Sequence, residues 1–539
     1  MAAPGNRPRA PRSTVGVLAV VAIGVVGVVA RFVTRSPLWL DEALSANIAG
    51  LGLGSIPEAL RHDGHPPLYY FLLHWWMNLF GEGDAEVRSL SGVLAVAALP
   101  LAWLVGRRVG GRRVAWATSL LLALSPFAVR YATETRMYAL VILLVLAGHL
   151  LVRRAVEERD APLPVLAGVA VVTGALVLSH YWALFLAAAV VGVLAWWGRR
   201  PRTERRPVAV RLVLAVAVGG LAFVPWLPSF LEQAAHTGTP WAAPARPTVV
   251  LNETIRDFAG GGVRAEAGLL SVALVVLVLL GLLTRDDHGA PAVEHDAAGA
   301  GGEGAESSIH LLARPAGSVT GEAAVVTLTL AIGAAVGLVT ASAFASRYAS
   351  VVFPLVLVIG GRGLALVPRG RPALVVGALV VGLSLVGIAG NVVDDRSQAA
   401  DFAGAIAGGA DVERDAVVVC PDQLGPATRR ALDEAGLADL ALHAYPTLDD
   451  GRFVDWYDYA ARNDAADPTA VAAELAARVD GAGQLWVVSN PAYRTFVGDC
   501  ERLIDALTAL RGPPSLVLQD GGSRFFEHAT LVRFGSAPP

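Results

Sequence analysis

Two short motifs near the start of the chain hold the residues best suited to chemistry. Trp39-Leu40-Asp41-Glu42 and His65-Pro66-Pro67-Leu68 both follow the first long apolar segment. A carboxylate is costly to desolvate beside a membrane, so an adjacent pair in a very hydrophobic chain indicates a functional site. Such a carboxylate can act as a general base that takes the proton from an attacking hydroxyl. The simpler alternative is a solvated acidic loop, because acidic residues are common on protein surfaces.

Further polar residues occur near the ends of later apolar segments, and the topology derived below places them on the same face as Asp41 and Glu42. Arginines there could bind a phosphate bidentately and offset its charge as it leaves. Simpler roles stay open: Arg88 can anchor a span end, Glu134 and Arg136 can pair, and His180 can be an interfacial histidine with satisfied hydrogen bonds. The candidate catalytic residues are Asp41 and Glu42, and the candidate substrate-binding residues are His65, Arg88, Tyr131, Glu134, Arg136, Tyr138, His180, Tyr181, Arg347 and Tyr348.

Composition indicates a membrane protein with many spans. The chain has 539 residues, of which 54% are hydrophobic and 17% charged, and its net charge of −3 argues against a nucleic-acid partner. Runs of about 20 apolar residues recur along its first part, which is the length needed to cross a bilayer. We predict about eleven transmembrane helices, at 14–34, 87–106, 114–130, 137–152, 162–180, 182–198, 208–228, 266–284, 322–344, 348–366 and 372–391.

The arginines determine the expected orientation of these spans. They cluster in four loops, and all four loops face the cytoplasm if the N-terminus does, as the positive-inside rule requires. The apolar stretch 67–80 would reach only about 21 Å as a helix, so we place it on the outer surface instead of across the membrane. The clusters are Arg107, Arg108, Arg112 and Arg113; Arg153, Arg154 and Arg159; Arg199, Arg200, Arg202, Arg205 and Arg206; and Arg362, Arg369 and Arg371.

The chain changes character after residue 391. Strand-like runs alternate there with helical patterns, which predicts a small α/β domain on the outer face. It has no nucleotide-binding motif, and the sequence leaves open whether its two cysteines, Cys420 and Cys500, form a disulfide. The expected organisation is a cytoplasmic N-terminus 1–13, a transmembrane catalytic domain 14–391 with a first outer loop 35–86 and a disordered cytoplasmic linker 285–321, and an extracytoplasmic α/β domain 392–539.

Several motifs resemble the GT-C superfamily of membrane glycosyltransferases, in the branch with protein O-mannosyltransferases, the aminoarabinose transferase ArnT and the Rgt-type enzymes. They are WLDE, HPPLYY, EVRSLSG, ALSPFAVRYATETRMYAL, SHYW, PWLP and SRYASVVFP, spread over residues 14–391. The resemblance implies a GT-C fold with Asp41 as catalytic base. Glu42 would orient or tune Asp41 or help to position the acceptor, and His180 and the outer arginines would contact the donor phosphate. A lysine sometimes found in the family is absent, so its role would fall to His65 or an arginine.

The sequence therefore predicts an inverting glycosyltransferase of the cell membrane. It would move mannose, or another hexose or pentose, from a polyprenyl-phosphate donor to a lipid, glycan or protein acceptor on the outer face. The sequence leaves open whether the reaction requires a divalent cation. One alternative is a transporter or flippase of a lipid-linked sugar, which should show inverted repeats and polar groups near the midplane. The other is a non-catalytic scaffold of envelope assembly, in which Asp41 would be dispensable.

Overall fold

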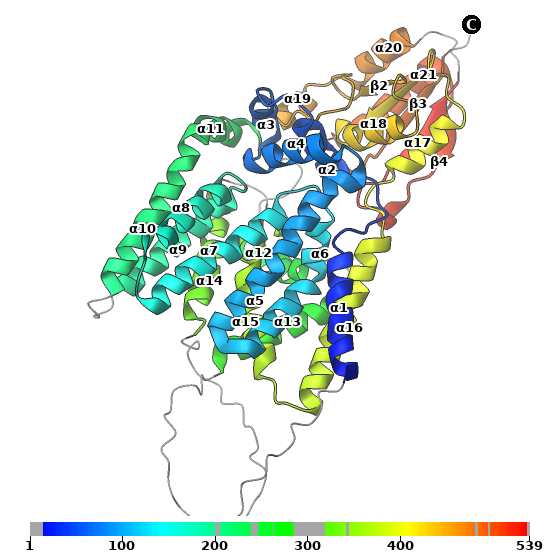
Figure 1. Ribbon diagram of the computed structural model, residues 1–539. Helices are drawn as coiled ribbons and strands as arrows, with labels where there is room; N and C mark the ends of the chain where they lie inside the picture. The colour runs from blue at the N-terminus through cyan, green and yellow to red at the C-terminus, as the bar shows by residue number, and fades with distance from the viewer. Residues whose placement is uncertain are drawn as a thin grey trace, which may run out of the picture.

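A bundle of apolar helices with an α/β domain at one end makes up the molecule (Figure 1). The computed structural model describes residues 14–199, 205–238, 246–261, 264–284, 318–340, 344–479, 483–493 and 496–535. The expected N-terminus 1–13 and most of the expected linker 285–321 lie outside these residues, as does Arg202. The predicted fold class, a helical membrane protein with a small C-terminal α/β domain, is confirmed.

Within the described residues, six helical segments are long and apolar enough to cross a membrane, which makes this a multi-pass membrane protein. They are Asp84–Ala123 (α5), Tyr138–Glu158 (α7), Arg205–His236 (α10, η1 and α11 together), Ala265–Leu283 (α13), Thr320–Val339 (α14) and Arg371–Val393 (α16). Four shorter apolar helices accompany them: Thr14–Val29 (α1), Leu163–Val177 (α8), Trp182–Gly198 (α9) and Phe353–Leu366 (α15). A separate short helix, Pro126–Ala132 (α6), follows α5.

Helix α5 turns back on itself and so accounts for two of the predicted spans. Gly110 and Gly111 break the helical geometry, and the φ of 76° at Gly111 lies in the left-handed region that favours glycine. A Cβ on Gly106 would lie 2.8 Å from the Cα of Ala115, so the two arms pack closely at the turn. The predicted spans 87–106 and 114–130 therefore form a hairpin with an arginine-rich turn.

Three short helices lie between the end of the bundle and the α/β domain (Figure 1). They are Leu40–Ala49 (α2), Ile56–Asp63 (α3) and Leu68–Phe80 (α4). Helix α4 is the apolar stretch that the sequence predicts on the surface because it is too short to span the membrane. This loop places both chemistry-bearing motifs, WLDE and HPPL, at the junction of the two parts of the molecule.

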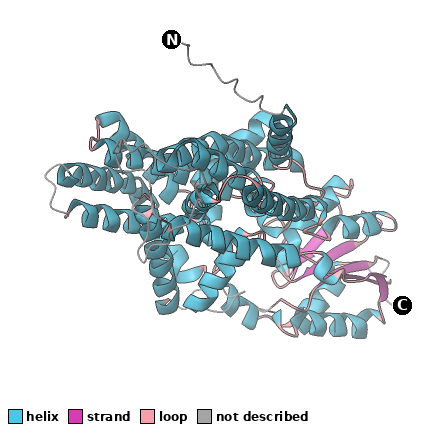
Figure 2. Ribbon diagram, turned by 90° about the horizontal axis from the view of Figure 1, so that it is seen from below, coloured by secondary structure: helices cyan, strands magenta, loops and turns pink. Residues whose placement is uncertain are grey.

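The C-terminal domain has one five-stranded sheet in the order β2-β1-β3-β5-β4. Figure 2 shows these strands gathered beside the helical bundle. Strands β1, β2 and β3 are parallel, β5 runs antiparallel to β3, and β4 runs antiparallel to β5. The strands are Ala416–Cys420 (β1), Ala441–Ala444 (β2), Leu485–Ser489 (β3), Ser515–Leu518 (β4) and Thr530–Phe534 (β5), all in the region where the sequence predicts an α/β domain.

Helices cover both faces of this sheet, because its central strands are buried on both sides. Val417 and Val419 pack toward Ala399–Ala407 (α17) and Gly425–Glu434 (α18), whereas Ala416 and Val418 pack toward the opposite layer. That layer consists of Pro468–Arg478 (α20) and Asp499–Arg511 (α21). The sequence prediction omitted α17, Pro247–Phe258 (α12) and Tyr459–Asp464 (α19), which are all short helices.

A disulfide and a set of polar contacts hold the domain together and against the bundle. Cys420 and Cys500 are bonded to each other, with an S–S distance of 2.06 Å, which decides the question that the sequence left open. Trp39 and Leu40 of the WLDE motif are buried in the core of the α/β domain. Across the same junction Arg430 pairs with Asp84 at 2.7 Å, His62 with Asp455 at 2.7 Å, and Asn47 donates to the carbonyl of Arg452 at 2.6 Å.

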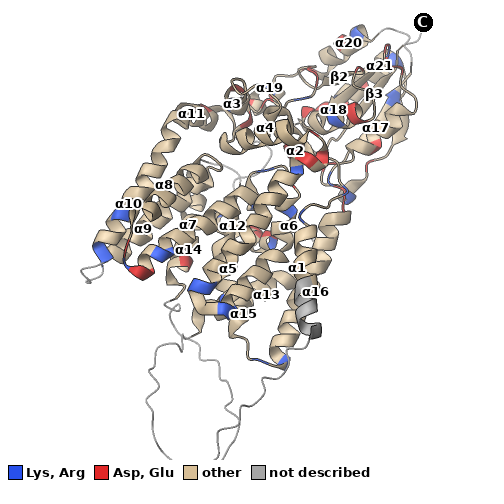
Figure 3. Cartoon of the chain, in the orientation of Figure 1, with Lys and Arg blue, Asp and Glu red and all other residues tan. Residues whose placement is uncertain are grey.

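Charged residues distribute unevenly along the bundle (Figure 3). The arginine-rich ends of α7, α10 and α15 and the turn of α5 lie at the end away from the α/β domain. In this region Arg108 pairs with Glu157 at 3.1 Å and with Glu158 at 3.2 Å. The clusters thus share one end of the bundle, as the predicted topology requires.

Candidate active site

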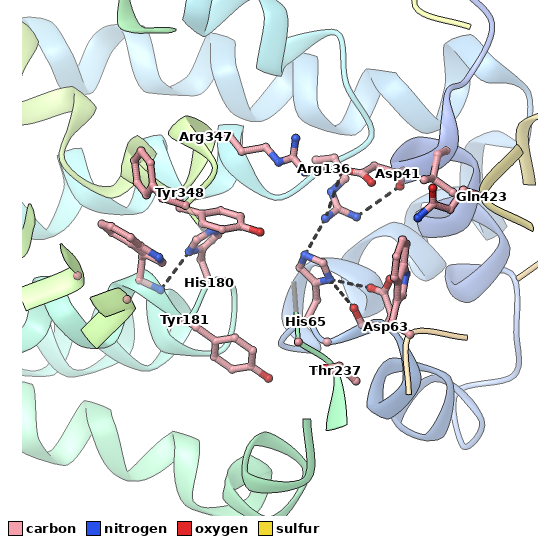
Figure 4. Close-up of a pocket in the computed structure, with 18 of the residues that line it drawn as sticks. Asp41, Asp63, His65, Arg136, His180, Tyr181, Thr237, Arg347, Tyr348 and Gln423 are labelled. Carbon is pink, nitrogen blue, oxygen red and sulfur yellow. Dashed lines mark hydrogen bonds and ion pairs between the residues drawn. The ribbon is translucent and has the colours of Figure 1, made fainter. Parts of the chain in front are cut away.

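A cavity of about 620 Å³ lies where the end of the bundle, the first loop and the α/β domain meet (Figure 4). Residues far apart in the sequence converge on it from these three regions. The predicted site residues that line it are Asp41, His65, Arg136, His180, Tyr181, Arg347 and Tyr348. The structure therefore brings together most of the residues that the sequence singled out.

Asp41 lies in the first turn of α2 with its carboxylate on the cavity wall. Its Oδ2 atom is buried and has no hydrogen-bond partner. Two cations are close to that oxygen: Nη2 of Arg347 at 3.3 Å and Nη2 of Arg136 at 3.9 Å. A buried carboxylate oxygen that is left without a hydrogen bond, but beside cations, can accept a proton from a ligand.

Glu42, the next residue, points into the protein and does not line the cavity. Arg88 donates to its two carboxylate oxygens at 2.7 and 2.6 Å, and the backbone N–H of Thr135 donates at 3.0 Å. Arg396 lies 3.6 Å from the same carboxylate. Burial alone would raise the pKa of Glu42, but Arg88 and Arg396 hold it below its usual value. In this arrangement the carboxylate of Glu42 is held away from the cavity, and the guanidinium of Arg88 is occupied by Glu42.

Behind Asp41 a hydrogen-bonded chain connects Arg136 to the first loop (Figure 4). Arg136 donates to Nε2 of His65 at 2.7 Å, and Nδ1 of His65 bonds to Oδ2 of Asp63 at 2.8 Å. Because a guanidinium can only donate, Nε2 accepts and the imidazole proton lies on Nδ1. Tyr70 donates to the same Asp63 oxygen at 2.8 Å. The chain fixes the direction of the Arg136 guanidinium.

Asp63 was not among the predicted site residues, although it lies only two positions before His65. Burial would raise its pKa, but His65 and Arg136 hold the pKa of Asp63 below its ordinary value. Gly64 between them has a φ of 84°, a left-handed conformation that reverses the chain and turns His65 back toward Asp63. The Asp-Gly-His spacing was the signal that could have identified it.

His180 lies in the turn between α8 and α9 and faces the cavity as a neutral ring. Burial, followed by the nearby His65, Arg136 and Arg347, lowers the pKa of His180 to about 3. Its Nδ1 accepts the N–H of Trp182 at 3.1 Å, so the proton lies on Nε2. His180 can therefore donate a hydrogen bond to a ligand without adding a positive charge.

Arg347 comes from the short helix Ser346–Val351 (η2), directly before α15. Its guanidinium carbon lies 5.9 Å from the ring centre of Trp39 and 6.0 Å from that of Tyr348. With Arg136 it places two guanidinium groups on one wall of the cavity. Two arginines in a partly desolvated pocket provide the donor geometry that phosphate oxygens prefer.

Three further predicted residues lie outside the cavity lining. Glu134 accepts a hydrogen bond from Arg130 at 3.0 Å, so its charged partner is not the neighbouring Arg136. The rings of Tyr131 and Tyr138 are 4.6 Å apart, and both are buried. The ring of Tyr138 lies 5.8 Å from that of His180, which does line the cavity.

The α/β domain supplies a wall that sequence reasoning did not anticipate. Two of its buried side chains, Gln423 and Glu527, each have an Oε1 atom with no hydrogen-bond partner. The domain residues that line the cavity are Gln423, Trp456, Asn490, Ala492, Tyr493, Phe526, Glu527 and His528. The role of this domain, which the sequence left open, thus includes completing the cavity.

The surroundings of Asp41 do not favour the binding of a metal ion. Within the described ranges, no group of three or more His, Cys, Asp or Glu side chains is arranged to hold one. Asp41 is ion-paired with Arg136 and Arg347, and two positive charges there favour binding of an anion over binding of a further cation.

A second cavity of about 580 Å³ lies at the arginine-rich end of the bundle, between α7, α8, α9, α10 and α14. Apart from its polar end, its walls are largely apolar. At that end Glu322 accepts from Nε2 of His149 at 2.9 Å and also from Arg153. Its buried charges are thus paired within the protein.

Comparison with known proteins agrees with the fold. Residues 64–228 match the family model of dolichyl-phosphate-mannose-protein mannosyltransferases, from the His65-Pro66-Pro67 motif to PWLP. No curated protein is significantly similar to the whole sequence. The family match therefore covers the first half of the bundle and starts after WLDE.

Solved structures extend the likeness over nearly the whole chain. ArnT from Cupriavidus metallidurans bound to undecaprenyl phosphate has a TM-score of 0.56 at 14% identity, covering 98% of this chain and 100% of that one. Its apo state has a TM-score of 0.58 at 13% identity, with 98% and 99% covered. The Archaeoglobus fulgidus oligosaccharyltransferase in complex with Zn and sulfate has 0.52 at 13% identity, with 87% and 67% covered. The expected resemblance to the GT-C superfamily is confirmed, and at these identities it establishes the fold.

Proposed function

We propose that this chain, a membrane protein with the GT-C fold, is an inverting glycosyltransferase that takes a sugar from a polyprenyl-phosphate donor. The observation that carries the proposal is the carboxylate of Asp41. Its buried oxygen has no hydrogen-bond partner, lies 3.3 Å from Arg347 and faces a cavity large enough for a sugar and a phosphate. A base next to an anion site is the arrangement that glycosyl transfer from a phosphate requires.

The chemistry assigns a role to each group on the membrane side of the cavity. The acceptor hydroxyl attacks the anomeric carbon on the face opposite the phosphate, and Asp41 takes its proton as the new C–O bond forms. The old C–O bond breaks, and its electrons leave with the phosphate oxygen. Arg347 and Arg136 stabilise the charge that develops there, and Nε2–H of His180 can donate a further hydrogen bond. The anomeric configuration inverts because one displacement occurs.

The apolar side of the cavity supports a lipid-linked donor. Phe185, Val250 and Ala334 line it from α9, α12 and α14, so the cavity continues between membrane helices. An isoprenoid chain could lie there while its phosphate meets the arginines. The structural relative ArnT was solved with undecaprenyl phosphate, which is a ligand of this class.

We also propose that the cavity opens on the outer face of the cell membrane, with the N-terminus inside and residues 392–539 outside. The arginine clusters lie at the opposite end of the bundle, which suits the cytoplasmic side. The Cys420–Cys500 disulfide suits an oxidising compartment. Residues 14–391 would then form the catalytic domain.

A transfer assay tests this function directly. The full-length protein in lipid nanodiscs is mixed with polyprenyl phosphates carrying different sugars and with acceptors, and products are identified by mass spectrometry. We expect one donor to yield free polyprenyl phosphate and a glycosylated acceptor with inverted anomeric configuration. Failure of every donor, together with movement of intact lipid-linked sugar across proteoliposomes, would support the transporter alternative instead.

A further inference from the structure

The two walls of the reaction cavity differ in charge. The membrane-side wall carries Arg136 and Arg347 beside the base Asp41. Among the described lining residues of the α/β domain there is no arginine, and His528 is already paired with Asp520 at 2.7 Å. A phosphate therefore has arginine partners on the membrane-side wall, whereas the described lining residues of the α/β domain, which form the neutral wall, include no arginine.

Two residues of the neutral wall each carry a polar atom that lacks a hydrogen-bond partner within the protein. Oε1 of Gln423 and Oε1 of Glu527 are buried without hydrogen-bond partners, and the two residues are 2% and 4% exposed. Gln423 lies beside Asp41 in Figure 4. Because buried polar groups are nearly always hydrogen-bonded, atoms left open on a cavity wall indicate a ligand that completes them.

The protonation of Glu527 shows which partners it can take. Ser397 donates to its Oε2 at 2.6 Å. Burial, together with the negative charges of Asp41 and Glu42, raises the pKa of Glu527 to about 8, so its carboxyl carries a proton at neutral pH. Glu527 can then donate a hydrogen bond, whereas Oε1 of Gln423 can only accept one. One donor and one acceptor near Asp41 are complementary to hydroxyl groups, because each hydroxyl can both donate and accept a hydrogen bond.

Aromatic rings complete the neutral wall. Trp456, Tyr493 and Phe526 line it from the α/β domain, and Trp39 packs edge-on against Phe526 with ring centres 4.9 Å apart. Such rings offer apolar faces with a polar edge, which suit the C–H face of a sugar ring. The wall therefore combines stacking surfaces with single hydrogen-bonding groups and carries no group that would attract an anion.

We infer that the acceptor is a neutral glycan, and that the α/β domain binds it through Gln423, Glu527 and the aromatic side chain of Trp456, with one sugar hydroxyl directed at Asp41. This inference rests on the proposed transferase function and names the acceptor class for the same cavity. A phosphorylated acceptor would lack a cation on this wall. A single serine or threonine hydroxyl that donates its proton to Asp41 has no second hydrogen for Gln423, so it would leave that atom unsatisfied.

The test compares acceptor classes on the full-length protein in nanodiscs. Neutral oligosaccharides of mannose, galactose and arabinose, a sugar phosphate and a serine- and threonine-containing peptide are assayed for binding by saturation-transfer NMR and for glycosylation by mass spectrometry. We expect binding and glycosylation of a neutral oligosaccharide. Glycosylation of the peptide or the sugar phosphate alone would overturn the inference.

Variants locate the site. We expect Gln423→Leu to raise the acceptor KM at least tenfold, with kcat and the affinity for undecaprenyl phosphate nearly unchanged, because the donor contacts lie on the other wall. Gln519→Leu is the matched control, since Gln519 is exposed in the same domain and does not line the cavity. An unchanged acceptor KM in a folded Gln423→Leu protein would contradict the inference.

Trp456→Ala provides a second variant in case Gln423→Leu does not fold, and we expect the same rise in acceptor KM. Undecaprenyl phosphate binding, measured separately by thermal shift, distinguishes the two levels of the proposal. A protein that binds the lipid and transfers sugar only to a non-glycan acceptor keeps the transferase function and loses the glycan inference. A wild-type protein that neither binds the lipid nor transfers sugar overturns the transferase function itself.

Discussion

Two cavities of similar volume, about 620 and 580 Å³, differ in how the protein pairs the carboxyl groups that line them. At the arginine-rich end, Glu322 takes hydrogen bonds from both His149 and Arg153. At the end beneath the α/β domain, Asp41, Gln423 and Glu527 each keep an oxygen without a hydrogen bond. Carboxylates that the protein satisfies itself serve the fold, whereas polar atoms left open on a cavity wall indicate that a ligand completes them.

The same contrast occurs between adjacent residues of α2. Glu42 is fully buried, and both oxygens of its carboxylate accept hydrogen bonds from Arg88. Asp41 faces the cavity with 17% of its side chain exposed. Removing a group of the first kind should cost stability, and removing one of the second kind should cost activity.

Asp41→Asn should abolish most turnover. The amide keeps the shape of the carboxylate but cannot take a proton, and losing a positioned base costs about 10²- to 10⁴-fold in rate. Donor binding should remain, because the arginines are intact. Transfer rate and undecaprenyl phosphate affinity are measured together, with Glu322→Gln of the other cavity as the comparison. Near-normal turnover in a folded Asp41→Asn protein would remove Asp41 as the base.

Arg88→Met should affect the fold most. It leaves Glu42 as a buried charge without its principal partner, and breaking one side of a buried pair costs about 3–5 kcal/mol. The midpoint of thermal unfolding should drop accordingly. The double variant Glu42→Leu/Arg88→Met should recover much of this loss, because it removes both charges. A single variant as stable as the wild type would show that the pair is not structural.

Arg347→Leu should weaken use of the donor while the protein still folds. A charge-assisted hydrogen bond contributes about 1.5–3 kcal/mol, so the donor KM should rise by about 10- to 150-fold. Arg153→Leu removes an arginine at the other cavity and should leave the donor KM unchanged. An equal effect of both substitutions would indicate a general loss of folding instead of a lost phosphate contact.

Glu527→Gln should change how stability depends on pH. The folded-state pKa of about 8 lies above the ordinary value of 4.5, so the wild type loses stability as pH rises from about 4.5 through about 8. The neutral amide has no proton to lose and avoids this decline. Relative to wild type, the variant should therefore melt at an increasingly higher temperature between about pH 5 and about pH 9. A constant difference across this range would show that Glu527 titrates normally.

His149→Leu should have the smallest effect on catalysis. It removes one of two hydrogen bonds to Glu322, and Arg153 retains the other, so we expect a stability loss of about 1–3 kcal/mol. Turnover per folded molecule should stay within about twofold of the wild type, since the residue is remote from Asp41. A large fall in turnover with unchanged stability would assign a functional role to the second cavity and break the division between the two.

Local patterns in the sequence were enough to predict most of the helices and strands. Apolar runs with arginine-rich loops gave the bundle, and the alternation after residue 391 gave the sheet domain, because hydrophobic periodicity depends on neighbours along the chain. Helix α5 illustrates this, since its two arms lie in the predicted spans 87–106 and 114–130 and are joined at Gly110 and Gly111. Short helices such as α19 were missed because a helix of only 6 residues is too short to show a clear hydrophobic periodicity.

The motifs also identified the membrane-side wall of the cavity. Asp41, His65 and Arg136 were recognisable because they belong to short motifs at the ends of spans. Asp63 was overlooked even though it belongs to the same loop, and its bond to His65 is a local one. For this half of the site, residue type and sequence position together were informative.

Only the tertiary structure decided which polar atoms are paired. Adjacent residues on a helix point about 100° apart, and the reach of Arg88 determines that Glu42 is the one satisfied. Gln423 and Glu527 come to face Asp41 because the α/β domain packs its core around Trp39 and Leu40. The chemistry of this protein depends on such long-range contacts, since whether a buried carboxylate is paired or open is a property of the assembled fold and not of any stretch of its sequence.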